Sequence, residues 1–583
     1  MLGNLIHLKK YFARYKKNLI WGFIFIILSN IGQVYVPILL KDSIDALQKN
    51  LREEILIKYA LSIVGVTILS GFFRYMIRQT IIVMSRHIEY DLRHDFWEHI
   101  QKLPLRFFQN NSTGNIMSHA TNDISAVRMA VGPSVMYSLD NGTKFLMILP
   151  LMIILSPILT FYSLLPLPVF SFLVYLVMKK VHVKYTRIQE KFSELTTKAQ
   201  ENFAGIRVIK SYVREDYEIK EFTRHSSEYL MRHMDLVRLQ AFFQPIFFSI
   251  AGLSSIIVLL VGGDMVIKGS LSLGVISAFF AYLGMLIWPM ISFGWVANMI
   301  QQADASMKRL LKIFREPSEI YDKNNEKNSN INIKGEIEFR NVEFRYSDVL
   351  PPVLQNISFK IKQGQTVAFI GHTGVGKTTL INLIPRLYDP TKGEVLIDGV
   401  NVKEIPLDVL RTNIGLVSQE TFLFSDTLAN NIAYGLNNKV DGIVERTANI
   451  AQLSKDVSDF PKGFDTIVGE RGITLSGGQK QRTTLARALA IDPKILILDD
   501  SFSAVDTNTE ESILRELKMF MKDRTSIIIS HRISTVKDSD KIFVLDKGSI
   551  VEEGTHEELV AKGGIYADLY FKQLLEEELK EIN

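Results

Sequence analysis

The segment Gly371–Thr378, which reads GHTGVGKT, combines three glycines with a lysine and a threonine. A strand-like apolar run, Thr366–Ile370, precedes it, and helix-like sequence, Thr379–Leu387, follows it. Glycines let the backbone wrap closely, so successive N–H groups point at one anion. A simple glycine turn needs no lysine or threonine, whereas a phosphate site uses the ammonium on the outer phosphates and the hydroxyl on a metal ion. The segment therefore predicts a site for ATP and Mg²⁺.

The residues that would contact this nucleotide are contiguous in the sequence. Lys377 is placed to reach the β- and γ-phosphates, and Thr378 offers its hydroxyl to Mg²⁺. The predicted nucleotide contacts in this stretch are Gly371, His372, Thr373, Gly374, Val375, Gly376, Lys377, Thr378 and Thr379.

A second candidate for holding the metal lies about 120 residues further along the chain. Ile495–Leu498 is a short, fully apolar run typical of a buried strand, and Asp499 and Asp500 follow it directly. A carboxylate at the end of a buried strand beside a phosphate loop is where nucleotide-hydrolysing proteins hold Mg²⁺. Asp499 and Thr378 are therefore predicted Mg²⁺ ligands.

Between these two candidates, Leu475–Gln479 reads LSGGQ and is followed by Lys480–Arg482. This segment resembles the signature sequence of ATP-binding-cassette (ABC) proteins. The order of segments along the chain resembles that of ABC exporter half-transporters, and the resemblance covers nearly the whole chain. It implies an all-α polytopic membrane domain followed by an α/β P-loop cassette, with ATP hydrolysis coupled to export.

The resemblance also implies roles for individual residues of the cassette. Tyr346 matches an aromatic residue that stacks on adenine, and Gln419 matches a glutamine that contacts Mg²⁺ and senses the membrane domain. His531 matches a histidine that contacts the γ-phosphate. Ser503–Asp506 matches a loop that crosses the dimer interface, and Val468–Gly472 looks like the exporter segment that contacts the coupling helices.

In this family, two cassettes hold two ATP molecules between them, head to tail. Ser476, Gly478 and Gln479 would therefore contact ATP that is held by a partner chain. Dimerisation of the cassettes turns the membrane cavity outward, and hydrolysis resets it. The partner that the resemblance implies is a second ABC exporter half-subunit.

One position departs from the family pattern. Asp500 stands where a glutamate usually acts as general base toward the attacking water. The carboxylate of aspartate sits further back by roughly 1.5 Å, and misplacement by about 1 Å can cost on the order of a hundredfold in rate. In heterodimeric exporters such a substitution marks the subunit with a degenerate ATP site and an intact signature. We expect a heterodimer, and the alternative is a slow homodimer with Asp500 as base. The candidate catalytic residues are Asp500, His531 and Gln419.

Six stretches in the first half of the chain are long and apolar enough to cross a membrane as helices. They are roughly residues 18–40, 56–80, 133–155, 158–179, 244–266 and 275–298. The third stretch is interrupted by Asp140, Asn141 and Lys144, which a bundle interior or a wet cavity would explain.

The topology follows from the charges that flank these stretches. Lys9, Lys10 and Arg14 precede the first span, so the positive-inside rule places the N-terminus in the cytosol, and six spans return the cassette to the same side. The first apolar run has no small-residue cleavage site, and we expect a retained span rather than a signal peptide. Ile88–Leu103 and Val183–Lys210 have helical apolar spacing, which indicates membrane helices that continue into the cytosol. Two small inserted domains are the alternative.

The expected domain plan has five parts along the chain. These are an N-terminal cytosolic segment (1–17), a six-helix membrane domain (18–310), a linker (311–335), an ATP-binding domain (336–571) and a C-terminal tail (572–583). Asp322–Asn330 is polar and predicts a mobile tether. Phe107–Gly114 with Asn122 and Asp123 resembles the first coupling turn of the family, and Gly205–Lys210 lies in the region of the second.

Composition excludes several other classes of protein. The chain has no cysteine, so disulfides, thiolate metal sites and cysteine nucleophiles are excluded. A net charge of +5 over 583 residues gives no reason to expect a nucleic-acid partner. The six spans exclude the soluble ABC ATPases of DNA repair and translation, and the fused order disfavours importers. An ATP-gated channel or channel regulator with the same architecture remains an alternative to an exporter.

The substrate that the resemblance implies is a small amphipathic compound, drug- or lipid-like, exported across the cytoplasmic membrane. Polar and aromatic positions in or near the spans could line a cavity for it, or could simply pair with one another. These positions are Asn30, Gln33, Arg74, Arg78, Asp140, Lys144, Gln244 and Trp288.

Overall fold

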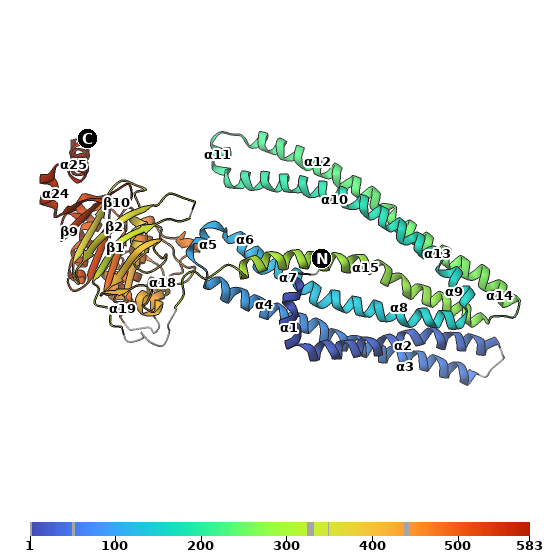
Figure 1. The fold of residues 1–583 in the computed structure, drawn as a ribbon. Helices are drawn as coiled ribbons and strands as arrows, with labels where there is room; N and C mark the ends of the chain where they lie inside the picture. Colours follow the sequence, from blue (N-terminus) through green and yellow to red (C-terminus); the bar gives the residue numbers. More distant parts are fainter. Residues whose placement is uncertain (1–2, 49–52, 323–330, 348, 437–441, 583) are drawn as a thin grey trace. The chain divides into compact units, whose positions relative to one another are not determined.

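The structure is a computed structural model that describes residues 3–48, 53–322, 331–347, 349–436 and 442–582 (Figure 1). The chain divides into two compact units. The first unit comprises Met1–Glu98 and Gly114–Arg315, and the second comprises His99–Thr113 and Glu316–Asn583. The predicted tether over 323–330 lies outside the described residues.

The first unit is entirely helical in its described residues. Its elements and those at its borders are η1 (Leu5–Leu8), α1 (Lys9–Arg14), α2 (Lys16–Gln48), α3 (Glu53–Ile77), η2 (Arg78–Ile82), α4 (Val83–Gln101), α6 (Thr113–Ser118), η3 (His119–Asp123), α7 (Ile124–Met129), η4 (Ala130–Ser134), α8 (Val135–Leu155), α9 (Pro157–Leu164), α10 (Pro166–Ala204), α11 (Ile206–Ser211), α12 (Glu215–Ala241), α13 (Phe243–Ile257), η5 (Val258–Gly262), α14 (Gly263–Ile267) and α15 (Leu273–Phe314).

Among the described residues of this part of the chain, four continuous helices are long and apolar enough to cross a membrane. They are Lys16–Gln48, Glu54–Gln101, Thr113–Leu155 and Leu273–Phe314, and each contains one of the predicted spans. The two remaining predicted spans are also helical, over α9 with the start of α10 and over α13, η5 and α14. The membrane-spanning half of the fold is therefore made by helices whose length the apolar runs had indicated.

Two helices continue well beyond their predicted spans, as the apolar spacing had indicated. α4 continues from α3 through the π-helical turn η2, and α10 extends over 39 residues. α10 and α12 run side by side (Figure 1), tied by ion pairs from Lys191 to Glu228 at 3.0 Å and from Lys198 to Glu218 at 2.6 Å. Continuous helical extensions, rather than separate inserted domains, therefore connect the predicted spans.

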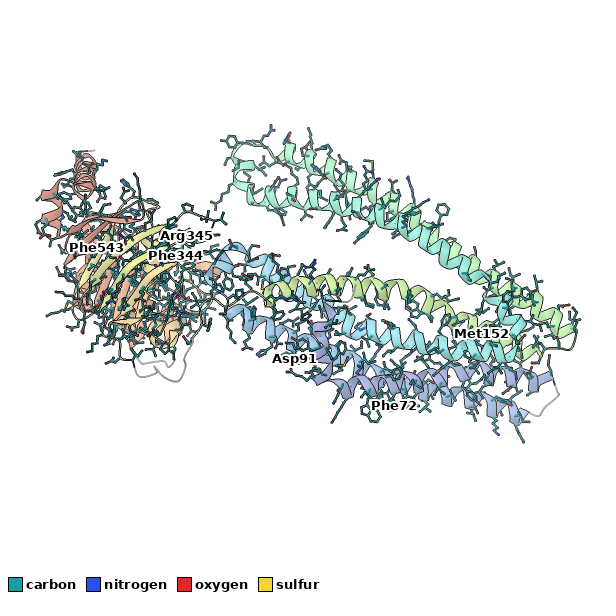
Figure 2. The ribbon with its side chains drawn as sticks, in the orientation of Figure 1. Phe72, Asp91, Met152, Phe344, Arg345 and Phe543 are labelled. Atoms are coloured by element: carbon teal, nitrogen blue, oxygen red, sulfur yellow. The ribbon has the colours of Figure 1, made fainter. Side chains whose placement is uncertain are left out.

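The N-terminal basic cluster is attached to the first of these extensions. Lys10 pairs with Asp95 at 2.8 Å, and Arg14 pairs with Asp91, which is labelled in Figure 2, at 2.6 Å. The Tyr11 hydroxyl also donates to Asp95 at 2.7 Å. The N-terminus and α4 therefore lie on the same side of the predicted membrane. This agrees with the predicted topology, because the chain crosses the membrane twice between them.

The second unit is an α/β cassette. Its elements are α5 (Leu105–Asn110), β1 (Ile337–Phe344), β2 (Leu354–Ile361), β3 (Thr366–Ile370), α16 (Lys377–Asn382), β4 (Lys392–Ile397), β5 (Val400–Asn401), α17 (Leu407–Thr412), β6 (Ile414–Val417), α18 (Leu428–Ile432), η6 (Ala433–Gly435), α19 (Ile443–Ile450), α20 (Ser454–Asp459), η7 (Gly463–Asp465), η8 (Glu470–Gly472), α21 (Gly477–Ala490), β7 (Ile495–Asp499), α22 (Thr507–Met521), β8 (Thr525–Ile529), α23 (Ile533–Val536), β9 (Lys541–Asp546), β10 (Ser549–Gly554), α24 (His556–Lys562) and α25 (Ile565–Ile582).

The strands of the cassette form two sheets. The six-stranded sheet has the order β10-β9-β3-β8-β7-β6, parallel except for the β10 edge, and the four-stranded antiparallel sheet has the order β2-β1-β4-β5. Alternate residues of the central strands enter two different cores. One face packs on helices that include α19, α21 and α22, and the other packs on the four-stranded sheet and α16. Burial on both faces explains the apolar runs Ile495–Leu498 of β7 and Ile527–Ile529 of β8.

This topology determines where the functional loops meet. β3, β8 and β7 are parallel neighbours, so their carboxyl ends open at one edge of the sheet. The phosphate loop follows β3, Asp499 and Asp500 end and follow β7, and His531 comes shortly after β8. The helix after the loop is shorter than predicted, because α16 ends at Asn382 before Pro385, which disfavours helix in the residue ahead of it.

A buried carboxylate ties two helices of the first unit together. Asp123, at the end of η3, accepts hydrogen bonds from two nitrogens of the Arg309 guanidinium on α15, one of them at 3.0 Å. His119 Nδ1 lies 2.6 Å from the same carboxylate, and Ser306 accepts from Arg309 at 3.0 Å. Asp123 was considered only for the coupling turn, and the structure shows that it also joins segments 186 residues apart.

We expect this contact to behave as a coupled pair in a double-mutant cycle. Asp123→Asn should lower the free energy of unfolding by about 1–2 kcal/mol, since Arg309 is half exposed and its charge is partly screened. Arg309→Gln should have little further effect in the Asp123→Asn background. Thermal unfolding of the purified protein measures both effects, with Lys308→Gln, an exposed neighbour, as control. Additive losses would show that the two side chains act independently.

Candidate nucleotide site

The phosphate loop runs from the end of β3 to the start of α16 with a backbone that requires glycine. Gly371 has φ +151°, and a Cβ there would lie 2.3 Å from the carbonyl oxygen of Leu545. Gly376 has φ +102°, and a Cβ there would lie 2.9 Å from the Leu354 side chain. Side chains at these positions would both strain the loop and collide with β2 or β9. The predicted reason for the glycines is therefore visible as close backbone approach.

Lys377 lies inside the loop that precedes it. Its ammonium donates to the carbonyl oxygens of Gly371 at 2.8 Å and His372 at 3.0 Å. Burial lowers the pKa of Lys377, while the nearby carboxylates of Asp499 and Asp500 oppose that change. Within the described residues its hydrogen-bond partners are these two carbonyls, and a buried ammonium so placed is well suited to bind the negative charge of a phosphate.

The two predicted metal ligands meet across the end of the sheet. The Thr378 hydroxyl donates to Asp499 Oδ2 at 2.8 Å, although 121 residues separate them. Burial raises the pKa of Asp499, which is 2 % exposed, while Thr378, Lys377 and His531 act in the opposite direction. Hydroxyl and carboxylate oxygens are the donors that Mg²⁺ prefers, so this pair fits that ion. No hydrogen bond joins Gln419, which follows β6, to either group within the described residues.

Tyr346 lies beside the loop in a small aromatic cluster. Its hydroxyl is 2.9 Å from the Thr379 hydroxyl, and its ring meets those of Phe344 and Tyr388 edge to face, with centroids 5.0 and 5.5 Å apart. Burial raises the pKa of Tyr388, an effect that a hydrogen bond with Gln109 of α5 opposes. The 99–113 segment, which contains most of the predicted first coupling turn, therefore reaches this cluster within the second unit.

The signature segment forms the start of α21. The Ser476 side chain accepts from the Gln479 N–H at 3.2 Å, and the Gln479 side chain accepts from the Ser476 N–H at 3.0 Å, which is a capping box. Gln479 also donates to Asp456 at 2.9 Å. Across the described chain, no hydrogen bond joins Ser476, Gly478 or Gln479 to the phosphate loop. The prediction that these residues contact a partner's ATP stays a prediction.

Gln481 is a residue that the sequence did not single out. It is buried, its amide donates to the Ser503 hydroxyl at 2.9 Å, and its carbonyl accepts from the Ala504 N–H at 2.9 Å. Gln481 therefore fixes the 503–506 loop onto the signature helix. Because it stands inside a polar helical run, nothing local to the sequence distinguishes it from its neighbours.

His531 is held through its backbone by a second glutamine that the sequence did not reveal. Gln573 on α25 donates to the His531 carbonyl at 2.5 Å and accepts from the Ile533 N–H at 2.8 Å. On the other side of this segment, Arg532 donates to the buried Glu510, which also accepts from Thr535 at 2.7 Å. The described residues 572–582, expected to be only a tail, are helical, and one of them contacts the functional segment.

Asp500 has a fixed backbone at the end of β7. Its φ is +46°, its N–H donates to the Ile529 carbonyl at 2.9 Å, and its carbonyl accepts from the Ser503 hydroxyl at 3.2 Å. Main-chain bonds to β8 and to the following loop therefore set where its side chain begins. The Asp500 side chain is one methylene shorter than a glutamate, and these main-chain bonds hold the backbone to which it is attached.

Known proteins resemble both parts of the chain. Residues 19–290 match the ABC transporter transmembrane region, and residues 354–503 match the ABC transporter family. The chain is also similar to a solved structure of a bacterial Atm1-family ABC exporter with ATP bound. That likeness has a TM-score of 0.78 at 26 % identity and covers 96 % of this chain and 99 % of the other.

Two relatives illustrate the range of similar proteins. The multidrug resistance-like ATP-binding protein MdlA of Escherichia coli is 34 % identical over 90 % of this chain and 89 % of its own length. The ATP-dependent lipid A-core flippase of Syntrophus aciditrophicus is 35 % identical over 93 % of this chain and 90 % of its own. Both relatives are matched over nearly their whole length, membrane half and cassette together. The chain therefore belongs to the ABC transporter family, as a multi-pass membrane exporter in which a helical domain is fused to a nucleotide-binding cassette whose ATP hydrolysis is coupled to transport.

Proposed function

We propose that this chain exports amphipathic drug- or lipid-like compounds across the cytoplasmic membrane as one half of a two-chain transporter. Relatives that match it along nearly their whole length are called a multidrug resistance-like protein and a lipid A-core flippase. The first name concerns drugs and the second concerns a lipid. The N-terminus and cassette lie in the cytosol, where ATP is available, in agreement with the basic N-terminal cluster.

Each residue of the site has a proposed role in nucleotide binding. Lys377 neutralises the outer phosphates, Tyr346 stacks on adenine, and the N–H groups of the 371–379 loop surround the phosphates. Thr378 and Asp499, with Gln419, would hold Mg²⁺, which supplies charge neutralisation on the phosphate oxygens. His531 contacts the γ-phosphate. Ser476, Gly478 and Gln479 serve the ATP of the partner.

Exposed apolar side chains where α10 ends and α12 begins are evidence for a second chain in the transporter. Phe203 is 77 % exposed and Val213 is 82 % exposed, although this end lies beyond the predicted spans. A shallow cavity of about 370 Å³ lies here, lined by residues that include Ile206, Ile219 and Phe222. Apolar surface in water is typical of a protein interface, so a partner subunit would cover it.

The observation that carries the heterodimer proposal is Asp500, together with an intact signature. The anchored backbone leaves the Asp500 carboxylate back from the position of a glutamate, so this chain binds ATP in a site that turns over poorly. Leu475–Gln479 keeps every residue of the signature and would complete the active site of the partner. The partner should carry the glutamate and an altered signature. The rival proposal is a homodimer that hydrolyses slowly through Asp500.

We expect Asp500→Glu to raise ATP turnover of the chain purified alone by about ten- to a hundredfold, since the carboxylate then reaches the attacking water. Asp500→Asn should leave the low turnover of the unmodified chain nearly unchanged. Phosphate release in lipid nanodiscs measures both variants, with Asp523→Glu, an exposed aspartate, as control. Robust turnover by the unmodified chain that Asp500→Asn abolishes would refute the heterodimer and support the homodimer.

Lys377→Ala tests which of the two sites hydrolyses. In the complex of this chain with its partner, the variant should weaken nucleotide retention on this side while part of the ATPase activity survives. Retention of photoreactive ATP on each chain, measured beside phosphate release, separates the two effects. Lys392→Ala removes an exposed lysine of the same cassette and serves as control. Complete loss of turnover in Lys377→Ala would mean that this chain's own site performs hydrolysis.

Gln573 is expected to be a positioning residue for His531. Gln573→Leu removes both of its hydrogen bonds and should weaken ATP binding by about two- to tenfold. ADP binding should not change, because ADP lacks the γ-phosphate that His531 contacts. Titration of the chain purified alone with fluorescent ATP and ADP analogues measures the ratio, with Lys572→Ala on the same helix as control. Equal weakening of ATP and ADP would indicate a purely structural role for Gln573.

A further inference from the structure

A polar cavity lies among the helices of the first unit. It has a volume of about 420 Å³ and is lined by Gln33, Arg74, Ile77, Arg78, Met136, Tyr137, Asp140, Lys144, Gly284, Met285 and Trp288. These residues come from α2, α3 with η2, α8 and α15, all helices that contain predicted spans. Six of the eight positions that the sequence marked as candidates therefore line one cavity, and its size suits a small organic molecule.

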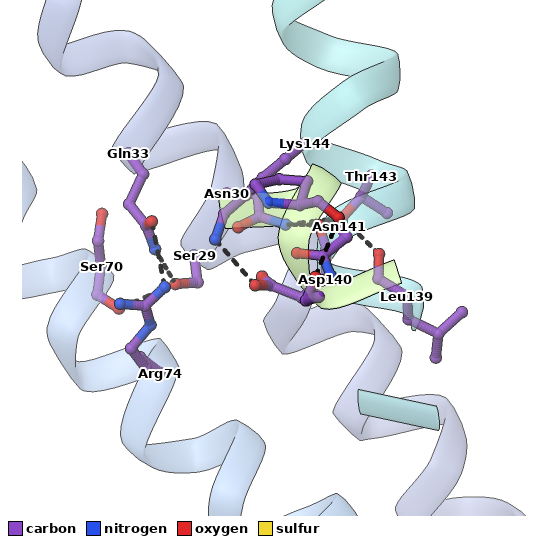
Figure 3. Close-up of polar contacts among 12 residues, drawn as sticks. Ser29, Asn30, Gln33, Ser70, Arg74, Leu139, Asp140, Asn141, Thr143 and Lys144 are labelled. Carbon is purple, nitrogen blue, oxygen red and sulfur yellow. Dashed lines mark hydrogen bonds and ion pairs between the residues drawn. The ribbon is translucent and has the colours of Figure 1, made fainter. Parts of the chain in front are cut away.

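The charges in this cavity do not balance. Lys144 pairs with Asp140 one turn away at 2.8 Å, so these two charges offset each other (Figure 3). Arg74 has a neutral partner, since its guanidinium donates to Gln33 Oε1 at 3.3 Å. Among the carboxylates that the structure describes, none lies within 4 Å of the Arg74 or Arg78 guanidinium. Among the described residues, two positive charges of this cavity, on Arg74 and Arg78, therefore have no carboxylate partner.

The position of Arg74 is supported by a chain of hydrogen bonds that begins at a buried serine. Gln33 donates to the Ser29 hydroxyl at 3.0 Å, and Ser29 in turn donates to the Ser70 carbonyl at 3.2 Å. Ser29 is fully buried between α2 and α3. These bonds orient the Gln33 amide so that its oxygen faces Arg74 (Figure 3). The guanidinium of Arg74 is itself exposed, and it is held at one end of this polar network through Gln33.

Charged side chains inside a membrane are costly, so they are retained where a partner of opposite charge meets them. A guanidinium presents donors in a planar fork that matches carboxylate, phosphate and sulfate groups. Arg74 and Arg78 are four residues apart on continuous helix, which places both forks along one wall of the cavity. This wall therefore favours an anion and opposes a cation, because the carboxylate of Asp140 is already occupied by Lys144.

The remaining walls of the cavity suit an apolar body. Met136, Met285 and Ile77 contribute apolar surface, and Trp288 and Tyr137 contribute aromatic rings. Trp288 is 55 % exposed, so a large part of its ring is free to contact a ligand. Methionine side chains adapt to different shapes, which suits a site that accepts several related compounds.

We propose that this cavity binds amphiphiles that carry one anionic group, with the anion on Arg74 and Arg78 and the apolar body against Trp288 and the methionines. This proposal rests on the proposed export function and specifies the class of compound exported. It makes charge, rather than hydrophobicity alone, the property by which this chain selects its substrate.

The test compares a charged and an uncharged probe that otherwise differ by one methyl group, 11-(dansylamino)undecanoic acid and its methyl ester. Binding is measured by dansyl fluorescence to the full transporter in nanodiscs of phosphatidylcholine, without nucleotide. Arg74→Gln/Arg78→Gln should weaken binding of the acid by about tenfold or more and leave binding of the ester unchanged. Comparing variants for each probe removes the difference in how the two probes partition into lipid.

Matched variants separate charge from damage to the fold. Arg74→Lys/Arg78→Lys keeps both charges and should retain tighter binding of the acid, and Lys268→Gln, a lysine at the end of α14 outside the cavity, should behave as the unmodified protein. Equal loss of acid and ester binding in the glutamine variant, or no loss of either, would overturn the proposal. Competition by phosphatidylglycerol would support a lipid as the natural source of the anion. Displacement of the probe by acetate or inorganic phosphate at the same concentration would refute the proposal that the ligand must be an amphiphile.

Transport distinguishes failure of this inference from failure of the proposed function. ATP-dependent accumulation of the acid in inside-out vesicles, stronger than that of the ester, is the expected result. Equal accumulation of acid and ester would refute selection by charge while leaving ATP-driven export intact. If neither probe accumulated in an ATP-dependent way while the two arginines still strengthened binding of the acid, the result would count against export. The proposed binding site would remain supported.

Discussion

The cassette depends on the contact between the Thr378 hydroxyl and the Asp499 carboxylate. The two residues end segments that lie 121 residues apart, and they meet only because β3, β8 and β7 are adjacent parallel strands. Burial on both faces fixes the register of those strands, since a one-residue slip would turn apolar side chains away from their core. The geometry of the phosphate site is therefore a consequence of how two hydrophobic layers pack on one sheet.

Features with a local signal could be predicted from the sequence. Apolar runs indicated the spans and β7, and glycine spacing indicated the loop whose close contacts at Gly371 and Gly376 the structure shows. Long-range contacts of single polar residues had no such signal. Gln573 lies 42 residues from His531, and Asp123 lies 186 residues from Arg309, with ordinary polar sequence around each. Only the fold brings such residues together, so their function had to be learned from it.

The polar residues of the spans show where the sequence reached its limit. It marked Asp140, Lys144, Arg74 and Gln33 without deciding whether they pair or line a cavity, and the structure shows that both happen at one place. Asp140 and Lys144 pair within one helix, whereas Arg74 reaches Gln33 on another helix and remains without a counter-charge among the described residues. A pattern of residue types cannot distinguish these cases, because the difference lies in helix packing.

In the proposed heterodimer, this chain binds ATP in its own site, and hydrolysis takes place at the partner's site. The proposal depends on the contacts that hold the binding residues and Asp500 in place. Lys377 keeps its contact with the phosphate loop and Thr378 keeps its contact with Asp499, so this chain would supply the phosphate loop and the Mg²⁺ ligands for its own ATP. Hydrolysis would additionally need a carboxylate at the right distance from the attacking water, and main-chain bonds to β8 and to the following loop hold the backbone from which the shorter Asp500 side chain begins. In this proposal, binding energy would draw two cassettes together without hydrolysis at this site, and the intact signature would be the part of this chain that acts on the ATP of the partner. ATP binding at both sites would then drive closure of the two cassettes, and hydrolysis at the partner's site would control their reopening. This separation would follow from the one methylene that Asp500 lacks relative to a glutamate.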